Sequence, residues 1–287
     1  MLTLELRKRL TTGAIAVLVL IALVAAAATS CIGIELALLC VTALSCISCA
    51  EAVRLRSEPP QYMWTEFAIL AWSILTMLVV SWLSDCTYSQ FPRVVSAYLI
   101  LQSVGVVALF YYIHWRARSS IEAATRVLSE LPIAYWMVSV GGSSMLALLC
   151  AAQGATALGW MATVVAANDI AAYFVGRSVG GAKFSPQLSP NKTVSGSIGG
   201  YGGGIVAAVA ASALLPAHFG LLQTLVLAML VITAAQMGDL AKSYLKRMHG
   251  KKDTGALLPG HGGILDRMDG HFAAAPLVLA WMAHYSS

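Results

Sequence analysis

Apolar stretches long enough to cross a lipid bilayer dominate this sequence. A transmembrane helix needs about 20 mostly apolar residues, and charged or turn-rich breaks divide the chain into nine such stretches. Only 11% of the residues are charged, too few to cover a soluble globule of this size with polar surface. The sequence therefore predicts an all-α, polytopic membrane protein, and it excludes a disordered chain, a coiled coil and a nucleic-acid-binding domain. The predicted spans are 12–29, 31–50, 64–83, 94–115, 132–150, 155–176, 196–216, 219–241 and 270–285.

Basic residues are distributed unevenly between the predicted loops. With nine spans and a cytoplasmic N-terminus, every Lys and Arg except Arg93 falls in a cytoplasmic segment. Cytoplasmic loops of membrane proteins carry an excess of these residues. We therefore predict a cytoplasmic N-terminus and an external C-terminus. No clear cleavage site follows the basic segment 7–9, so we expect the first apolar stretch to be retained as a helix.

Side chains with chemical capacity gather in the C-terminal half of the chain. They lie in two predicted cytoplasmic loops, 177–195 and 242–269, and in the helix ends that lead into them. There is no inverted repeat of the kind common in transporters. We predict one membrane domain over 1–287, in which 1–150 supplies helices of unassigned role and 151–287 holds the active site.

Two polar residues, Asn168 and Asp169, interrupt the sixth apolar stretch. A carboxylate at this depth costs several kcal/mol unless it is paired, hydrated or bound to a metal. Asp169 is therefore a candidate metal ligand. A helix-helix hydrogen bond or a structural ion pair is the alternative.

The eighth apolar stretch carries a polar stripe. Its members are Asp239, Ser243, Lys246 and Arg247. Offsets of four, seven and eight residues place these side chains on one face of a helix. A solvated helix end would explain the two basic residues but not Asp239, which lies within an apolar run. We predict that this face lines the active site.

The loop that follows combines glycines with carboxylates. Gly262 and Gly263 allow backbone amides to approach an anion at a helix start, and His261 beside them is a candidate loop-fixing or substrate-binding residue. Asp266 and Asp269 can face one way in the next helix, near Lys and Arg. Such a site suits phosphate-bound Mg²⁺. Compensation of the helix dipole is the alternative role for the two carboxylates.

The loop before the seventh apolar stretch is rich in hydroxyl groups. Ser189, Lys192 and Thr193 directly precede a predicted helix, where phosphate oxygens are well accommodated. The Walker A pattern is absent. The glycines that follow form small-x-x-x-small ladders, Gly196, Gly200 and Gly204 in one and Gly199 and Gly203 in the other. We expect these glycines to serve close helix packing.

These residues together resemble a known family, the phosphatidate cytidylyltransferases or CDP-diacylglycerol synthases. The likeness covers roughly 160 to 270. Its signature positions here are Ser243, Leu245, Lys246, Arg247, Lys252, Asp253, Gly255, Leu258, Pro259, His261, Gly262, Gly263, Ile264, Asp266, Arg267, Met268 and Asp269. Upstream positions that also resemble the family are Asn168, Asp169, Ala172, Tyr173, Gly176, Arg177, Ser189, Pro190, Lys192, Thr193 and Gly196.

The resemblance implies a reaction of CTP with phosphatidic acid that yields CDP-diacylglycerol and pyrophosphate. It also implies Mg²⁺ dependence, a homodimer, and a site facing the cytoplasm at a bacterial inner membrane; whether a monovalent cation such as K⁺ joins Mg²⁺ is left open. The expected catalytic residues are Asp239, Ser243, Lys246, Asp266 and Arg267. The expected substrate-binding residues are Ser189, Lys192, Thr193, Lys252, Asp253, His261, Gly262 and Gly263. The expected metal ligands are Asp169, Asp239, Asp266 and Asp269.

Two other functions remain as alternatives. A CTP-dependent lipid-alcohol kinase would use the same nucleotide but transfer its γ-phosphate; the completeness of the signature argues against it. A transporter of an anionic metabolite would also place charges in helices, but repeat symmetry and broken helices would then be expected in both halves of the chain.

Overall fold

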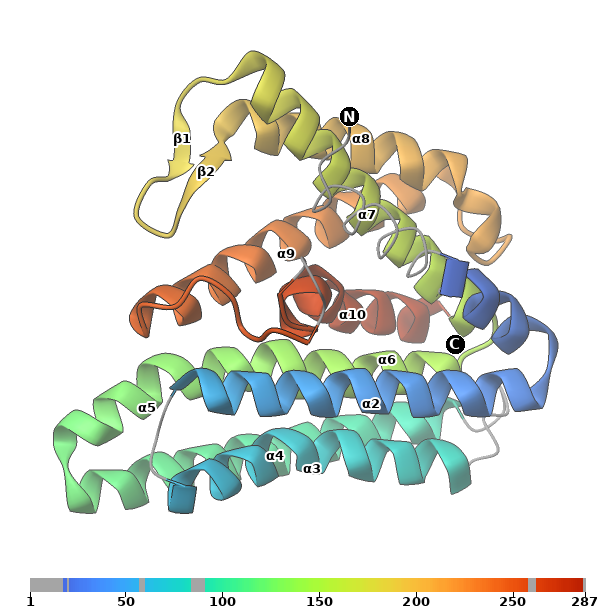
Figure 1. The fold of residues 1–287 in the computed structure, drawn as a ribbon. Coiled ribbons are helices and arrows are strands. Elements are labelled where there is room, and N and C mark those ends of the chain that lie inside the picture. The colour runs from blue at the N-terminus through green and yellow to red at the C-terminus, as the bar shows by residue number, and fades with distance from the viewer. Residues whose placement is uncertain (1–17, 20, 57–59, 84–90, 258–261, 286–287) are drawn as a thin grey trace.

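The protein is almost entirely helical, as the sequence predicts (Figure 1). The computed structural model describes residues 18–285 apart from 20, 57–59, 84–90 and 258–261. Residues 21–29 are helical. The elements that follow are α2 (Cys31–Arg56), α3 (Pro60–Leu83), α4 (Phe91–Ser119), α5 (Ile121–Ala134), the π-helix η2 (Tyr135–Val140), α6 (Gly141–Leu149), α7 (Gly154–Val179), β1 (Lys183–Ser185), β2 (Ser189–Thr193), α8 (Val194–Ala210), the 3₁₀ helix η3 (Ser212–Leu214), α9 (Leu221–Met248) and α10 (Leu265–Tyr285).

Every predicted apolar stretch contains helix, and six helical segments of the described chain are long and apolar enough to cross a membrane. These six are α2, most of α3, α4, the run from α5 to α6, α7 and α9. The helix α8 is also apolar but has only 17 residues, one fewer than the 18 required of these six. The chain is thus an integral membrane protein with an all-α fold.

The predicted fifth span, 132–150, belongs to a longer helical run. The helix α5 begins at Ile121, because Ser120 is in an extended conformation and its Oγ accepts the amide of Ala123. Pro132 lies within the run and is followed by the π-helical turns of η2, which re-pair the backbone without ending it. All residues of α6 are buried, so the end of this run lies inside the protein rather than facing lipid.

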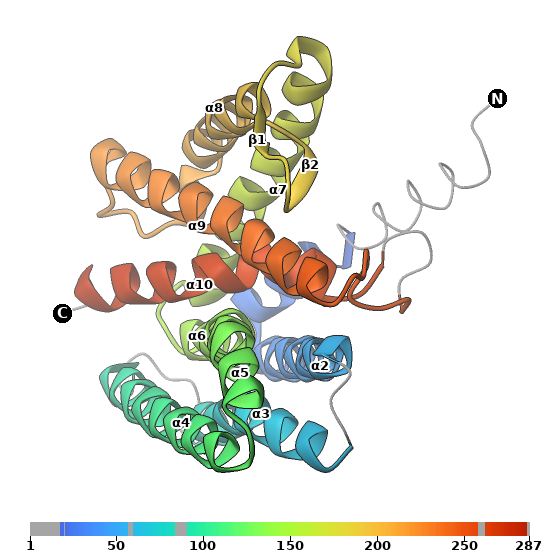
Figure 2. The same ribbon diagram turned by 90° about the vertical axis from the view of Figure 1, so that its left-hand side faces the viewer.

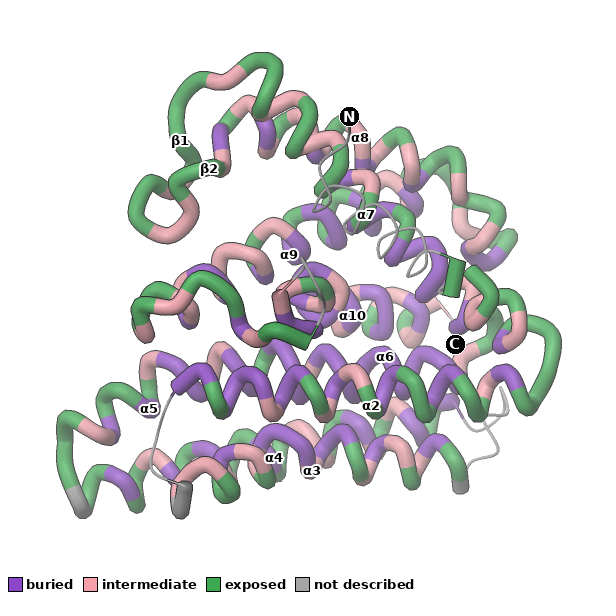
Figure 3. The backbone as a smooth tube through the Cα atoms, viewed as in Figure 1, coloured by how far each residue is buried: buried purple, intermediate pink, exposed green. Residues whose placement is uncertain are grey.

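The last helix, α10, lies between two groups of helices (Figures 1 and 2). It packs against α9 and α7 on one side and against α6 and α2 on the other. Phe272 on α10 is fully buried, and its backbone lies so close to α6 that a Cβ on Gly141 would meet the Phe272 Cα at 2.7 Å. Many of the buried residues lie on α6 and α10 around this contact, whereas the β1–β2 hairpin is largely exposed (Figure 3). Helix α10 therefore packs against both halves of the protein.

Glycines bring α7 and α8 into close contact, which confirms the predicted role of the glycine ladders. A Cβ on Gly196 would lie 2.8 Å from the carbonyl oxygen of Ala172, and one on Gly200 would lie 2.5 Å from Asn168 Oδ1. Gly199 and Gly203 face the side chains of α7 in the same way. Small residues of this kind let helix backbones approach each other in a membrane. The polar ends of α7 and α8 are thereby held side by side.

The hydroxyl-rich loop is more regular than expected. Strands β1 and β2 pair antiparallel, with Lys183 opposite Thr193, and form a short hairpin. Thr193 ends the hairpin and caps α8, since its Oγ1 accepts the amide of Gly196 at 3.1 Å. Lys192 and Thr193 therefore have a fixed backbone position at the start of α8.

Several segments that were predicted to be cytoplasmic meet at one end of the bundle. The ammonium of Lys251, after α9, donates to the backbone oxygens of Arg54 and Leu55 at the end of α2. Arg116, near the end of α4, lies 3.9 Å from the ring centroid of Tyr62 at the start of α3. This common location is what the predicted distribution of basic residues requires.

The packing of α8 predicts different outcomes for two neighbouring glycines. Gly203→Ala would place a Cβ 3.1 Å from the carbonyl oxygen of Ala167 and closer still to Ala171, so we expect a loss of about 1–3 kcal/mol. Gly202→Ala meets nothing within 4 Å and should be neutral or stabilising, because Ala favours helix. Thermal unfolding of both variants in detergent measures the difference, and equal stability would contradict this account of the α7–α8 contact.

Candidate active site

A cavity of about 840 Å³ opens between α7, α8, α9, the hairpin and the start of α10. Both predicted chemical regions, 177–195 and 242–269, contribute to it, together with the polar interruption in α7. Its charged lining residues are Arg177, Lys183, Lys192, Lys242, Lys246, Arg267, Asp169, Asp239, Asp253, Asp266 and Asp269. Most of the predicted site residues are thus gathered around one space, although they come from four separate elements.

Helix α9 supplies one wall of the cavity through Asp239, Lys242 and Lys246. Asp239 forms ion pairs with Lys192 of the hairpin and, at 2.8 Å, with Lys242 one turn further along its own helix. Of the predicted polar face, Asp239 and Lys246 line the cavity, whereas Ser243 does not. Arg247 lies at its edge, where Nε donates to the backbone oxygen of Leu188 at 3.3 Å.

Lys242 was not among the predicted site residues, yet it is the centre of the charge cluster. Its ammonium lies 2.8 Å from Asp239, 2.6 Å from Asp269 and 3.9 Å from Asp266. It also donates to the backbone oxygen of Asp266 at 3.2 Å. The side chain is only 8% exposed, so these carboxylates are what keep its charge stable in the interior. A spacing of three residues after Asp239 was the sequence signal for this pairing.

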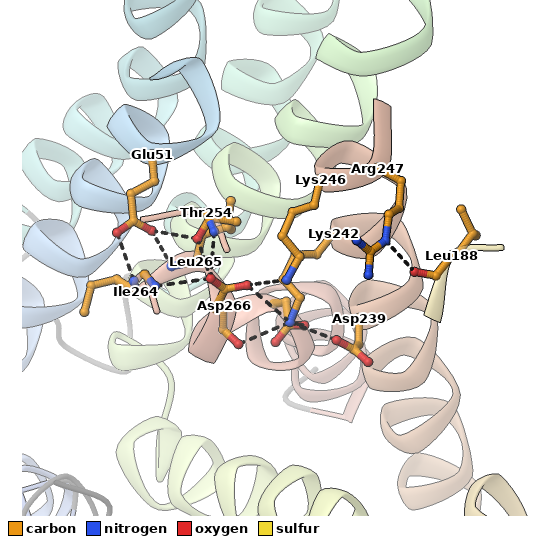
Figure 4. A network of polar contacts seen from close by, with 12 residues as sticks. Glu51, Leu188, Asp239, Lys242, Lys246, Arg247, Thr254, Ile264, Leu265 and Asp266 are labelled. Carbon is orange, nitrogen blue, oxygen red and sulfur yellow. Dashed lines mark hydrogen bonds and ion pairs between the residues drawn. The ribbon is translucent and has the colours of Figure 1, made fainter. Parts of the chain in front are cut away.

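Asp266 has a different set of partners. One carboxylate oxygen pairs with Lys246 at 2.7 Å, and the other accepts the amides of Thr254 at 2.8 Å and Gly263 at 3.2 Å. Burial alone would raise the pKa of Asp266, but Lys246 and the Thr254 amide outweigh that effect and hold the pKa below its usual value. Asp266 thus fixes the loop before α10, and one of its oxygens faces the lysines of α9 (Figure 4).

The polar residues Asn168 and Asp169 of α7 have different roles: Asn168 contacts another helix and Asp169 lines the cavity. Asn168 is buried, donates to Asp169 at 2.9 Å and accepts from Gln236 of α9, also at 2.9 Å. Gln236 in turn accepts a hydrogen bond from Ser197 of α8. Asn168 therefore makes the helix-helix hydrogen bond that was an alternative for this pair, and it leaves Asp169 on the cavity wall.

Other predicted residues lie outside the described lining of the cavity. Ser243 is buried on α9, Lys252 is exposed, and Ser189 lies at the start of β2. Gly262 has a φ of 79°, which only glycine adopts readily, and the amide of Gly263 donates to Asp266. His261 lies outside the described residues. The anionic groups closest to Gly262 and Gly263 are thus the carboxylates of Asp266 and Glu51.

A second residue missed by the sequence analysis is Glu51 of α2. Its carboxylate accepts the amides of Ile264 at 3.0 Å and Leu265 at 2.8 Å, at the start of α10. Thr254 Oγ1 lies 3.2 Å from the same carboxylate and 2.9 Å from Asp266 (Figure 4). No local pattern marks Glu51, because its partners are more than 200 residues away in the chain.

The carboxylates suit a hard divalent ion that is bound together with a substrate. Within the described part of the chain, no three acidic, His or Cys side chains are close enough to hold a metal by themselves. The ammonium of Lys242 lies between Asp239 and Asp269 and neutralises part of their negative charge. Without a positive charge near them, the two carboxylates would repel each other. Mg²⁺ needs only one or two protein carboxylates when phosphate oxygens and water complete its shell. The donor set therefore fits Mg²⁺ on a phosphate-bearing substrate.

Several known proteins with similar sequences bear the same name. The chain is 47% identical over 133 residues to a phosphatidate cytidylyltransferase of Brucella suis biovar 1 (strain 1330), which covers 46% of this chain and 49% of that protein. It is 40% identical over 141 residues to the phosphatidate cytidylyltransferase of Bacillus subtilis (strain 168), with the same two shares. The matched region thus spans about half the length of these curated relatives.

The similarity to a family as a whole extends much further along the chain. Residues 7–285 match the sequence model of the cytidylyltransferase family. This range includes the N-terminal helices as well as the cavity, so the match does not depend on the loop signature alone. The chain belongs to the cytidylyltransferase family.

Proposed function

We propose that the protein is a phosphatidate cytidylyltransferase, which converts CTP and phosphatidic acid to CDP-diacylglycerol and pyrophosphate. The observation that carries this proposal is the cavity lined by Lys192, Lys242, Lys246 and Arg267 at the polar ends of membrane-embedded helices. A lipid phosphate and a nucleotide triphosphate both need such a site. The relatives from Brucella and Bacillus, which bear this enzyme's name, support the same reaction.

The charge balance of the cavity favours two anionic substrates together with a divalent cation. Among the described residues, six basic and five acidic side chains line it, so their formal charges nearly cancel. A single phosphomonoester carries about −1.5 to −2 charges at pH 7, and CTP carries more. The basic side chains alone would leave the two substrates largely unneutralised, which is why Mg²⁺ belongs to this proposal.

Asp239, Asp266 and Asp269 are the proposed Mg²⁺ ligands, with Asp169 as a fourth carboxylate on the same cavity. The ion would be held by some of these oxygens together with phosphate oxygens of the substrates. When bound, it supplies positive charge for the phosphates and for the leaving pyrophosphate.

The side chains of the protein position the reactants and neutralise charge. The phosphate oxygen of phosphatidic acid is already anionic, so its in-line attack on the α-phosphorus of CTP needs no strong general base. Lys192 and Thr193, at the start of α8, would bind CTP phosphates, while Lys246 and Arg267 line the cavity from α9 and α10. Holding the two phosphates in line supplies a large part of the rate.

The finer parts of the topology are also proposals. Nine membrane crossings, with a cytoplasmic N-terminus at a bacterial inner membrane, would place the cavity at the cytoplasmic side, because Lys192, Lys242 and Lys246 belong to the predicted inner segments. CTP would enter there from the cytoplasm, and phosphatidic acid laterally from the bilayer. Residues 151–287 would form the catalytic part of a single domain, and the assembly would be a homodimer.

Incubation of purified protein with CTP, Mg²⁺ and phosphatidic acid tests the proposed reaction. CDP-diacylglycerol and pyrophosphate are the expected products. Formation of CDP with a phosphorylated lipid alcohol, when such an alcohol is offered, would instead identify the CTP-dependent kinase. Uptake of an anion into vesicles without turnover would identify a transporter.

Replacement of Lys192 should mainly weaken the use of CTP. Lys192→Met removes a positive charge that we place on CTP phosphates, and a hydrogen bond to a charged group contributes about 1.5–3 kcal/mol. We expect the KM for CTP to rise about 10- to 100-fold. Arg126→Met, which removes an exposed positive charge on α5, is the matched control. An unchanged KM for CTP in the Lys192 variant would remove this residue from the nucleotide site.

Replacement of Asp239 should abolish turnover without unfolding the protein. Asp239→Asn keeps the shape of the side chain but removes its charge, and loss of one electrostatic contact to a transition state costs about 10²- to 10³-fold in kcat. Steady-state rates over a range of Mg²⁺ concentrations measure the effect, and thermal unfolding in detergent tests the fold. Near-wild-type rates at limiting Mg²⁺ would refute the metal assignment, whereas loss of folding would favour a purely structural ion pair.

The proposed topology places the C-terminus outside the cell. A single cysteine in place of Ser286, in a cysteine-free background, should react with a membrane-impermeant reagent that is applied from outside. If only a reagent applied from the cytoplasmic side blocks it, the nine-crossing topology is wrong.

A further inference from the structure

Glu51 connects the N-terminal half of the chain to the cavity wall without lining the cavity itself. The residue lies near the end of α2 and is 7% exposed. Its two carboxylate oxygens are directed at the loop and first turn that lead into α10 (Figure 4). This contact joins α2 to the segment that carries Asp266.

The contact satisfies backbone groups that a helix start leaves without partners. The amides of the first turn cannot pair within the helix, and the helix dipole places partial positive charge there. Glu51 takes the amides of Ile264 and Leu265, while Asp266 takes those of Thr254 and Gly263. Each carboxylate thus accepts two amides, and the Thr254 hydroxyl lies within hydrogen-bond distance of both carboxylates, so the position of one constrains that of the other.

Two glycines of the loop are needed because Glu51 lies against them. A Cβ on Gly255 would come within 2.6 Å of Glu51 Oε1, and one on Gly263 would come closer still to Oε2. A real Cβ does not approach an oxygen this closely, so a larger residue at either position would displace the carboxylate or the loop. The glycines of the loop are thus shaped to a residue of α2.

We propose that Glu51 is a positioning residue: it fixes the backbone from Gly263 to Leu265 and thereby orients the Asp266 carboxylate toward Lys246 and the cavity. Its catalytic consequence rests on the proposed function. Glu51 touches no substrate in this scheme and acts through Asp266. Through Glu51, helix α2 thereby contributes to the reaction.

Three variants test this role. Glu51→Gln has the same size, but its amide nitrogen can only donate, so one of the two backbone amides loses its acceptor. Glu51→Asp keeps the charge on a shorter side chain. Glu35→Gln removes an exposed carboxylate from the same helix and is the matched control. All variants are assayed at a temperature at which thermal unfolding in detergent shows them to be folded.

Hydrogen exchange and kinetics should respond together. In Glu51→Gln, the amides of Gly263, Ile264 and Leu265 should exchange at least about tenfold faster, as measured by mass spectrometry of peptides from this region. The kcat should fall about 10- to 100-fold, because small displacements of a catalytic group have effects of this size. The KM for CTP should change less than about twofold, since Lys192 lies on another element. Glu51→Asp should recover part of the kcat, and Glu35→Gln should match the wild type.

The two parts of the experiment separate the possible failures. Unchanged exchange at Gly263–Leu265 in Glu51→Gln would refute the inference, as would a normal kcat in that variant. Wild-type protein that forms no CDP-diacylglycerol would refute the proposed function, and with it the catalytic part of the inference, whatever the exchange result.

Discussion

The ammonium of Lys242 is the interaction on which the arrangement of the cavity depends. It lies between Asp239 and Asp269 and near Asp266, and it thereby holds α9 against the first turns of α10. Separating the two helices would take Asp269 and Asp266 away from this buried charge, which would be strongly destabilising. Lys192 adds the hairpin to this group through Asp239. Charge neutralisation therefore helps to position the cavity wall.

The N-terminal helices provide the other half of the support for α10. Besides Glu51, a buried charge network lies at the same end of the bundle: Arg56 of α2 pairs with Glu66 of α3 at 2.9 Å and with Glu130 of α5 at 2.8 Å. Glu130 also contacts His249, directly after α9, at 3.0 Å. Ion pairs in the low-dielectric interior are stronger than in water, so they connect these helix ends. Helices that show no chemistry of their own in the sequence therefore hold the ends of α9 and α10 in place.

The sequence predicted the helical fold and most of the cavity because the relevant signals are local. Asp239 and Lys246 share a helix face by their spacing, the glycines of α8 form visible ladders, and Asp266 begins a helix after a glycine-rich loop. Lys242 could have been found by the same reasoning, since it lies one turn after Asp239. Ser243, by contrast, shares the predicted face only approximately, and the packing of α9 buries it away from the described cavity lining.

Long-range contacts were beyond the reach of the sequence for a physical reason. The requirement that Glu51 meets is created by the backbone amides of another helix, and backbone amides have no sequence signature. The only sign of the Glu51 contact in the loop sequence is indirect: Gly255 and Gly263, which lie against the carboxylate, have no Cβ. A glycine in a loop is usually explained by its own conformation, as Gly262 is by its positive φ. Gly263 has no positive φ, so the reason for its identity lies in the Glu51 carboxylate and the Thr254 hydroxyl, which both face it. The first turn of α10 therefore has partners on two sides. Lys242 pairs with the carboxylate side chains of α10, and Glu51 accepts backbone amides at the start of α10.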